Sequence, residues 1–550
     1  MARRSRQPRP RSTNPTEDLR TLNARCPACD QAMWSAYTSR RTVSTLGGPR
    51  PLRLHVRRCR NRSCPRYHQP YRPEAEGAVA LPQHEFGLDV IALAGALRHR
   101  EHRSVPEVHR ALLGRGLSVC ERTVTNLLDR YDELLAVRLS DSARLRAITA
   151  NQGRVVLAID GLQPDVGHEV LWVLRDCLSG EVLLARSLLS STEADLAGLI
   201  GEVRRALLVP IAGVVSDGRH SIRNAVAKAL PSVAHQLCHF HYLREAARPI
   251  YEADRHAKKE LKKRVRGIRA VERQAEGKGK GDDDDDPASR AVLGYCAAVR
   301  SAITDDGRPP LEASGLKLHA RLTDVAASLD HVLDAVDEQG GPPKALRKLK
   351  GIVGRALAQT APMWPEVRAG FDLVHRAAGV LANAAGSAAA AVRERYQAVK
   401  TEARRLAGDP ATTPALRRSL DHFLKVTASY EPGLFHCYDV PGLPRTNNDL
   451  EQLFGATRHH ERRCTGRKAA SPGLVLRGSV RVAAGLGTRV HGRPFTGEDL
   501  APRDPARWRA TRAALEQRRK ARVLRCRFRR NPAAYLRNLE QSLLKPALPA

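Results

Sequence analysis

The fold is decided by residues 154–188, which read RVVLAIDGLQPDVGHEVLWVLRDCLSGEVLLARSL. The stretch contains three apolar runs rich in Val, Leu and Ile, the composition and length of buried strands. Ser179 and Gly180 lie between the second and third runs and supply a turn. The stretch therefore predicts a three-stranded antiparallel meander.

Helical and extended patterns alternate after the meander. A capped amphipathic helix at 191–208 (STEADLAGLIGEVRRALL) leads to a buried strand at 211–217 (IAGVVSD), a helix at 218–230 and a strand at 232–239 (SVAHQLCH). The order β-β-β-α-β-α-β, with helical crossovers to the later strands, is typical of a ribonuclease H-like fold. We expect an α/β protein in which residues 152–245 form the first part of this core.

The rest of the chain is mostly helical in pattern. Residues 246–432 predict a large all-α insertion, interrupted by an acidic linker at 276–288 whose five aspartates could attract cations but which we interpret as solvated and disordered. Residues 433–490 predict the last part of the core, and 491–550 a basic tail that could follow a DNA backbone. Trp364 could stack on an extruded base, but a core position is the stronger prediction.

The charge of the chain points to a polyanionic partner. Its 550 residues carry a net charge of +34 and a pI of about 10.5. An enzyme acting on a small metabolite has no need of this excess, whereas DNA binding releases counterions for each neutralised phosphate. An anionic membrane is the weaker alternative, because no apolar run approaches the roughly 20 residues of a spanning helix. Residues 1–22 are basic and Pro-rich, which predicts a disordered arm and no secretory signal, hence a cytoplasmic protein.

Four of the eleven cysteines form two pairs near the N-terminus. Cys26 and Cys29 are separated from Cys59 and Cys64 by a predicted hairpin with a GGPRP turn, so residues 23–75 predict a zinc ribbon with one structural Zn²⁺. The second pair is wider than C-x-x-C, and His68 could replace one ligand. Four unrelated buried cysteines are the alternative.

Residues 84–137 predict three helices, the last two capped and joined through Gly114 and Gly116. Ser104 with Glu107, and Ser118 with Glu121, have the spacing of capping boxes. Two short helices around such a turn predict a helix-turn-helix. The final helix would bury Val124, Leu127, Leu128 and Tyr131. It would present Arg122, Thr125 and Asn126 to base edges. An ordinary helical packing domain is the alternative.

Two aspartates follow apolar strands and precede glycines. Asp160 ends the first predicted strand and Asp217 the fourth. These strands are adjacent and parallel in the predicted topology, so both carboxylates would meet at one sheet edge. Paired carboxylates need cations between them to stay ionised, and oxygen ligands suit two Mg²⁺ or Mn²⁺ ions that clamp a phosphoryl displacement. Ordinary Asp-Gly turns are the alternative.

A third ligand comes from the segment TNNDLEQLFGATRHHERR. Helical spacing aligns Asn447, Glu451 and Arg458 on one face, giving a carboxamide, a carboxylate and a cation. Glu451 is the predicted third carboxylate. Alternatively this segment caps the helix, with Thr446 and Asp449, or Asn448 and Glu451, as a capping box.

Together these motifs resemble bacterial insertion-sequence transposases of the DDE type, in the group similar to the Mutator-like transposases. Members share a first Asp after a strand, a second Asp, a Cys-or-Asp-x-x-His beyond it, a helical insertion and a final TNN-x-x-E helix. The matching positions here are Asp160, Asp217, Cys238 with His241, Asn447 with Asn448, and Glu451. The resemblance covers roughly residues 20–480, and the wide Cys59–Cys64 spacing departs from it.

The resemblance implies DNA transposition by metal-dependent strand cleavage and strand transfer, in a bacterial, nucleoid-associated protein that acts on double-stranded DNA as a dimer or larger assembly. Asp160 would bridge two ions, and Asp217 and Glu451 would each hold one. Cys238 and His241 would support this site and not bind zinc; a buried Cys and a helix-start His are the alternative.

Two other functions fit the same residues. One is a ribonuclease H-like nuclease or resolvase that cuts without strand transfer. The other is a domesticated, non-catalytic DNA-binding protein, against which the three carboxylates argue. A strand-transfer assay separates the first alternative from transposition.

Overall fold

The structure is a computed structural model that describes residues 14–163, 169–278, 287–305, 307, 310–337, 344–468, 471–502 and 504–544. Most of the predicted N-terminal arm and of the acidic linker therefore lies outside the described residues. The chain forms two compact units, and each is described by itself. The first draws on residues up to Ala212, on 224–231 and on residues from Asn448 onward, and the second consists of 213–223 and 232–447.

A β-ribbon opens the first unit. Its strands are β1 (Glu17–Leu19), β2 (Met33–Thr45), β3 (Gly48–Cys59) and β4 (Pro70–Tyr71). β3 pairs with β1, β2 and β4, and β2 and β3 form the predicted long hairpin. The hairpin turns at Leu46-Gly47, so only the first glycine of the predicted GGPRP turn lies in it, and Gly48 takes a φ of +98° that suits glycine. Alternate residues of β3 are buried, as the sequence pattern predicts: Leu52, Leu54 and Val56.

Five helices follow: α1 (Glu74–Val79), α2 (Leu88–His99), α3 (Val105–Leu113), α4 (Glu121–Leu139) and α5 (Ser142–Gln152). The predicted capping box of Ser104 and Glu107 is present at the start of α3. The second predicted box is wrong: α4 begins at Glu121 behind Cys120, so Ser118 lies two residues too early to cap it. α4 buries the four predicted residues and continues to Leu139, well beyond them.

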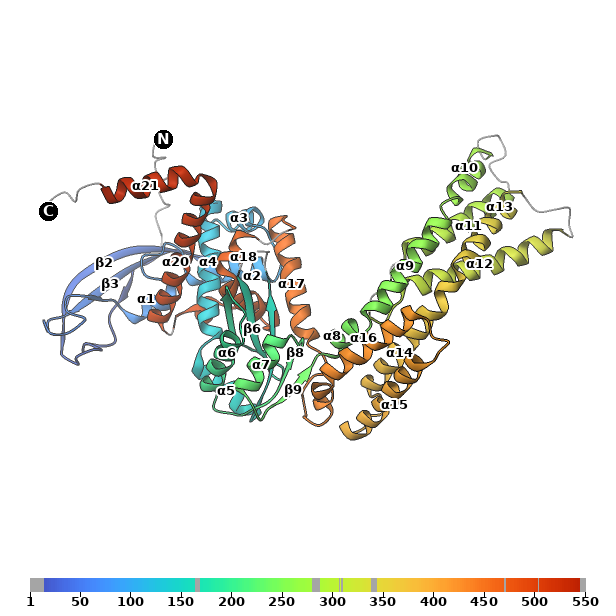
Figure 1. Ribbon diagram of the computed structural model, residues 1–550. Helices are drawn as coiled ribbons and strands as arrows, with labels where there is room; N and C mark the ends of the chain where they lie inside the picture. The colour runs from blue at the N-terminus through green and yellow to red at the C-terminus, as the bar shows by residue number, and fades with distance from the viewer. Residues whose placement is uncertain are drawn as a thin grey trace. The chain divides into compact units, whose positions relative to one another are not determined.

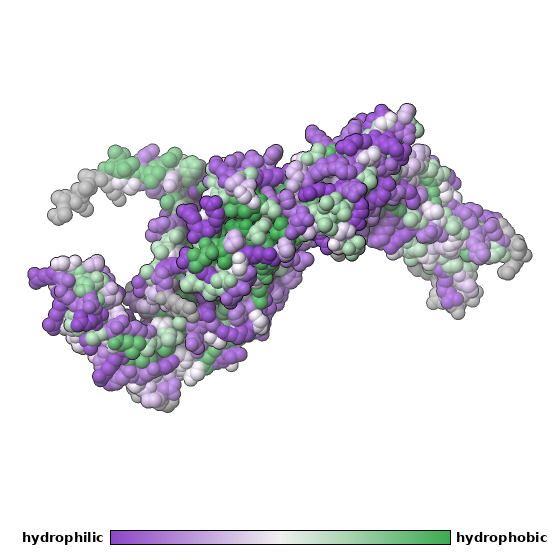
Figure 2. Space-filling model, turned by 90° about the horizontal axis from the view of Figure 1, so that it is seen from below, coloured by the Kyte–Doolittle hydropathy of each residue, from purple (hydrophilic) through white to green (hydrophobic). Residues whose placement is uncertain are grey.

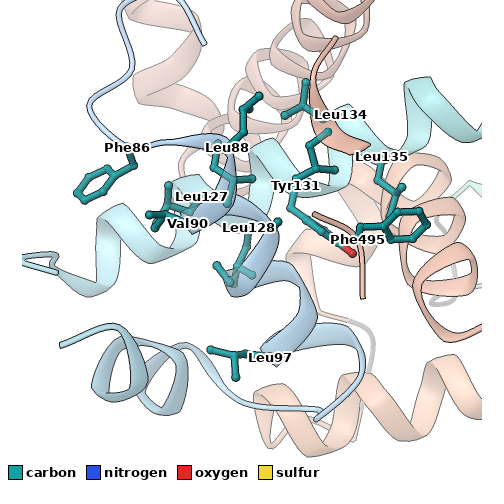
Figure 3. Packing of buried hydrophobic residues seen from close by; sticks show 14 of the residues in the cluster. Phe86, Leu88, Val90, Leu97, Leu127, Leu128, Tyr131, Leu134, Leu135 and Phe495 are labelled. Atoms are coloured by element: carbon teal, nitrogen blue, oxygen red, sulfur yellow. The ribbon is translucent and has the colours of Figure 1, made fainter. Parts of the chain in front are cut away.

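The length of α4 is explained by three of the five C-terminal helices, α18, α19 and α20, which pack along it. The five C-terminal helices are α17 (Asn448–Thr465), α18 (Pro472–Val490), α19 (Gly497–Leu500), α20 (Pro505–Arg530) and α21 (Pro532–Leu544). Phe495, Leu500 and Trp508 enter the core formed by α2 and α4, and Figure 3 shows Phe495 beside Tyr131 and Leu135. The segment predicted as a basic tail from residue 491 thus supplies part of this core.

The second sheet has the order β7-β6-β5-β8-β9. Its elements occur in the predicted sequence: β5 (Val155–Leu162), β6 (Val170–Asp176), β7 (Val182–Leu188), α6 (Glu193–Ala206), β8 (Ile211–Ser216), α7 (His220–Ala229) and β9 (Ala234–Leu237). β5, β6 and β7 are antiparallel, and β8 and β9 are parallel. β5 is buried on both faces, as expected of a central strand. The capping box of α6 uses Thr192 and Asp195.

The second unit is a helical assembly (Figure 1). It contains α8 (His239–Ala246), α9 (Arg248–Arg264), α10 (Ile268–Lys278), α11 (Pro287–Thr304), α12 (Ser314–Asp337), α13 (Lys344–Thr360), α14 (Trp364–Ala382), α15 (Ala389–Gly408) and α16 (Pro414–Tyr430). The unit is wider than the predicted insertion of 246–432, since it also includes β9 and the segment to Asn447. Trp364 is a core residue: its Nε1 donates to Thr360 Oγ1 at 3.2 Å, and its ring lies 4.7 Å from that of His319.

The C-terminal end of the described chain exposes apolar side chains. These are Leu536, Leu539, Leu543 and Leu544 of α21, together with Phe528 at the end of α20. In Figure 2 this end is green beside the grey terminal residues. Within the described residues, no helix is both long and apolar enough to cross a bilayer.

Candidate functional site

Cys26, Cys29, Cys59 and Cys64 form one cluster. Their sulfur atoms all lie within 4.8 Å of one another, with Cys26 Sγ 3.7 Å from Cys64 Sγ and Cys29 Sγ 3.6 Å from Cys59 Sγ. This is a four-thiolate set that could hold a structural metal ion. Cys64 completes the cluster as the second cysteine of the more widely spaced pair. His68 lies outside the cluster.

Tight turns of the backbone build both knuckles. The Asp30 amide donates to the Cys26 carbonyl at 2.8 Å, and the His68 amide donates to the Cys59 carbonyl at 3.3 Å. Asp30 and His68 both have positive φ, at 54° and 56°, where the chain reverses. An amide hydrogen bond from Ala28 lowers the pKa of Cys26 to about 7, whereas burial raises the pKa of Cys59 to about 12. A bound cation would keep all four thiolates ionised.

Asp160 lies in β5, with its side chain 8% exposed. Its Oδ1 accepts a hydrogen bond from the Gly161 amide at 2.7 Å. The prediction that Asp160 ends its strand is wrong by two residues, because pairing with β6 continues to Leu162. Gly161 is required by packing: a Cβ there would lie 2.9 Å from Val170 Cγ1. The glycine thus makes room for its β6 neighbours beside the carboxylate.

Asp217 follows β8 directly and is 6% exposed. Arg219 binds it twice: its amide donates to Oδ1 at 3.0 Å, and its Nε lies 2.9 Å from Oδ2. Gly218 has a φ of +83°, which turns the chain sharply after the carboxylate. Arg223 donates to the Gly218 carbonyl at 2.6 Å and covers the ring of Tyr430 at 4.3 Å. The Asp217 loop is therefore firmly positioned.

Cys238 lies beside the strand that carries Asp217. Its amide donates to the Ser216 carbonyl at 2.8 Å, and its sulfur accepts from the Asn447 amide at 3.3 Å. It is the N-cap residue of α8, and His241 is half-buried in the first turn of that helix. His239, to which the sequence assigned no role, donates from Nε2 to the Leu434 carbonyl oxygen at 2.7 Å, and burial lowers its pKa to about 4. It is a neutral structural histidine.

Glu451 occupies the first turn of α17, the helix that packs against β5. Its side chain is half-buried, whereas those of Asp449 and Arg458 are exposed. Asn447 is buried and immediately precedes the helix, which begins at Asn448. Neither of the two capping boxes considered from the sequence has its first residue at the position before Asn448. The first unit therefore brings the elements bearing Asp160 and Glu451 together.

Histidines and a cysteine that the sequence interpretation missed join the far end of α17 to the end of α2. His102 Nδ1 lies 2.9 Å from His460 Nδ1, Cys464 Sγ lies 3.5 Å from the same nitrogen, and the rings of His99 and His460 stack at 5.2 Å. Burial, reinforced by His99 and Arg98, holds the pKa of His460 far below its usual value. His99 and His102 are separated from His460 by more than 350 residues in sequence, so no local pattern could have paired them.

The predicted DNA-reading residues Arg122, Thr125 and Asn126 line a cavity of about 700 Å³. α18 and α20 form its other walls, so the face of α4 is one side of a groove. The guanidinium groups around it come from Arg122 and Arg130 of α4, Arg477 and Arg481 of α18, and Arg512 and Arg519 of α20. The contribution of α20 was outside the helix-turn-helix prediction.

Six arginines and four acidic residues line the groove, which leaves an excess of positive charge. Arg477 and Arg481 are neutralised by Asp129, Asp132 and Glu133 of α4. Burial and then Arg130 lower the pKa of Arg512, and burial, Arg130 and Arg512 lower that of His84 to about 4. The neighbouring cations thus destabilise one another's charged forms. A bound anion in the groove would relieve this repulsion.

No protein-family model and no curated protein matches this chain.

Proposed function

We propose that the protein is a DNA transposase of the DDE type with a ribonuclease H-like core, which cleaves and joins DNA strands by metal-dependent phosphoryl transfer. One observation carries the proposal. The Val155 amide at the start of β5 donates to the Pro210 carbonyl, just before β8, at 3.0 Å. Strands that start side by side would bring Asp160 and Asp217, five and six residues further along, to the same sheet edge, and α17, which carries Glu451, packs against β5.

The residues fit a pair of Mg²⁺ or Mn²⁺ ions. Asp160 and Asp217 are nearly buried carboxylates, and a buried carboxylate keeps its charge only with a partner. Arg219 is that partner for Asp217, but its side chain is 64% exposed and can move into solvent. Oxygen ligands from three carboxylates match the preference of these ions.

Each residue then has a definite task. When bound, the ions activate a water or a 3′-hydroxyl and neutralise charge on the leaving oxygen. Asp160 would hold both ions, with Asp217 and Glu451 holding one each. Arg219, released from Asp217, can pair with the DNA phosphate that approaches. Cys238, whose sulfur accepts a hydrogen bond from the Asn447 amide, would support the position of Glu451 at the start of α17.

The remaining parts of the proposal concern DNA. The four-cysteine cluster would bind one structural Zn²⁺ and order the ribbon. The groove that contains Arg122 and Asn126 would hold the element ends. Because two ends must be joined in concert, a homodimer or larger assembly on double-stranded DNA is part of the proposal.

The test uses labelled duplexes taken from the DNA that flanks the gene, with Mg²⁺. We expect strand cleavage, followed by transfer of the new 3′ end into a second duplex. Asp160→Asn and Asp217→Asn should abolish both steps while the thermal melt stays close to that of the parent. Cleavage without transfer would indicate a nuclease or resolvase, and end binding without cleavage in the parent would indicate a non-catalytic DNA-binding protein.

A further inference from the structure

Two aromatic side chains lie on one face of the β-ribbon. Trp34 pairs with Arg58 across the hairpin, and Tyr37 pairs with Val56, with a register shift between Ser35 and Tyr37. Cross-strand partners share a face, and residues two apart on β3 share a face. The bulge in β2 therefore returns Tyr37 to the side of Trp34. Without it, residues three apart would point to opposite faces.

Both rings are accessible and lie under arginines. Tyr37 is 41% exposed and Trp34 is half-buried. The Arg58 guanidinium lies 5.3 Å from the centre of the Tyr37 ring, and that of Arg60 lies 5.6 Å from the Trp34 ring. We call Trp34, Tyr37, Arg58 and Arg60 the ribbon platform. It alternates flat apolar surfaces with cations.

The charge around the platform is predominantly positive. Residues 23–70 contain ten arginines, no lysine and a single acidic residue, Asp30. Even after the two negative charges that a four-thiolate zinc site retains, a large positive excess remains. In Figure 2 the ribbon lies at the lower left, with hydrophilic purple over much of its surface. A protein partner would have to be strongly acidic, whereas a nucleic acid supplies negative charge and flat rings together.

We propose that the ribbon platform binds unpaired nucleotides of a single DNA strand, with bases stacked on Trp34 and Tyr37 and phosphates paired with Arg58 and Arg60. Only unpaired bases present a free face to an aromatic ring, and stacking of this kind tolerates any sequence. The platform is separate from the three carboxylates, so the inference goes beyond the phosphoryl-transfer function and does not depend on it.

Tryptophan fluorescence tests the inference in the full chain. Trp172, Trp364 and Trp508 are buried, so Trp34 is the tryptophan that a solute can reach. Titration with a twelve-nucleotide oligo(dT), without Mg²⁺, should quench the emission. Trp34→Ala should remove the quenching and weaken binding about 5- to 100-fold, while Trp34→Phe keeps much of the affinity. Zinc content and melting temperature of both variants show whether the ribbon remains folded.

Two controls make the result decisive. Tyr67→Ala removes an aromatic ring that is exposed but outside the platform, and it should leave oligo(dT) affinity unchanged. Asp160→Asn should bind oligo(dT) like the parent, so a failure of the cleavage proposal leaves this test intact. The inference is overturned if oligo(dT) leaves the emission unchanged, if Trp34→Ala binds normally, or if a duplex of equal length binds as tightly through Trp34.

Discussion

Arg463 donates two hydrogen bonds to Glu107, at 2.8 and 3.2 Å from Oε1 and Oε2, and so joins the last turn of α17 to the first turn of α3. Glu107 also accepts from the Ser104 amide and hydroxyl in the capping box of α3. One carboxylate thus starts a helix of the proposed DNA-binding part and holds the helix that carries Glu451. The Arg463–Glu107 ion pair therefore joins the helices proposed to bind DNA to the helix proposed to carry a catalytic carboxylate, and both lie in the first unit.

The ion pair between Arg463 and Glu107 makes the stability of the folded protein depend on pH. Hydrogen bonds from Arg463, and then from Ser104, hold the pKa of Glu107 far below its ordinary 4.5. A folded-state pKa below the unfolded value stabilises the protein above pH 4.5, and the stabilisation is lost as the pH falls further. Glu107→Gln should lower Tm by a few degrees at pH 7, and the difference from the parent should shrink below pH 4.5. Glu101→Gln, an exposed change nearby, is the control; a difference that stays constant from pH 7 to 3 would exclude the ion pair as its source.

Glu451→Gln tests the third carboxylate, because it keeps the shape and removes the charge. We expect it to abolish Mg²⁺-dependent cleavage while end binding and the thermal melt persist. Asp449→Asn is the matched control: Asp449 is exposed in the same turn, about 200° around the helix axis from Glu451. It should cost about 0.5–2 kcal/mol at most and leave cleavage largely intact. Normal cleavage by Glu451→Gln, or a dead Asp449→Asn, would refute the assignment.

Metal analysis tests the cysteine cluster. The full chain should contain one zinc per molecule, and Cys26→Ser or Cys64→Ser should reduce this content strongly, because three thiolates hold the ion less well than four. His68→Ala should leave it unchanged, since His68 is outside the cluster. Cys120→Ser controls for loss of an exposed thiol. If zinc content is unchanged in Cys64→Ser and lost in His68→Ala, then His68 and not Cys64 is the fourth ligand.

DNA binding should depend steeply on salt. With about six phosphate contacts, affinity should fall on the order of 10³-fold from 50 to 200 mM salt. Arg122→Ala and Asn126→Ala should weaken specific end binding more than binding to unrelated duplex. Arg519→Ala, on the α20 wall of the same groove, should weaken both equally and reduce the salt slope by about one. A flat salt titration contradicts the groove, and equal losses in all three variants contradict base reading by α4.

The close packing around Gly161 predicts that a larger residue there would destabilise the strand that carries Asp160. A methyl group there would meet Val170 at 2.9 Å and Trp172 at 3.3 Å, so Gly161→Ala should destabilise the protein by about 1–3 kcal/mol through overpacking. Adding Val170→Ala should restore part of that loss in a denaturant melt. Gly198→Ala, where a Cβ meets nothing within 4 Å, should be harmless. Additive losses in the double variant would show that the clash is not the cause.

Local chemistry explains which features the sequence predicted. The capping box of Ser104 and Glu107 and the burial of Leu52, Leu54 and Val56 depend on neighbours a few residues away. The order of strands and helices along the chain followed from where the spacing of apolar residues changes between the strand and the helix period. That spacing is also a local feature. The start of α4 was mispredicted because Ser118-x-x-Glu121 has the capping spacing, yet the chain enters the helix at Cys120.

Contacts between distant segments could not be predicted from spacing. The walls of the groove come from α4 and, more than 300 residues later, from α18 and α20. The stacking of His99 on His460 has the same origin. For the carboxylates, the sequence identified the residue types and the elements that bear them. Their arrangement around ions remains a prediction for the cleavage experiments.

The burial of α4 has a consequence for synthesis of the chain. Asp132 and Glu133 are almost fully buried, and their partners Arg477, Arg481 and Trp508 lie more than 340 residues later in sequence. At 5–20 residues per second, the ribosome takes roughly 20–70 s to deliver them after α4 has emerged. During that time α4 exposes apolar and acidic surface that only the finished chain covers. A chain truncated before residue 472 would therefore lack a completed core around α4, and under the proposed function it would not make a competing inhibitor of the intact protein.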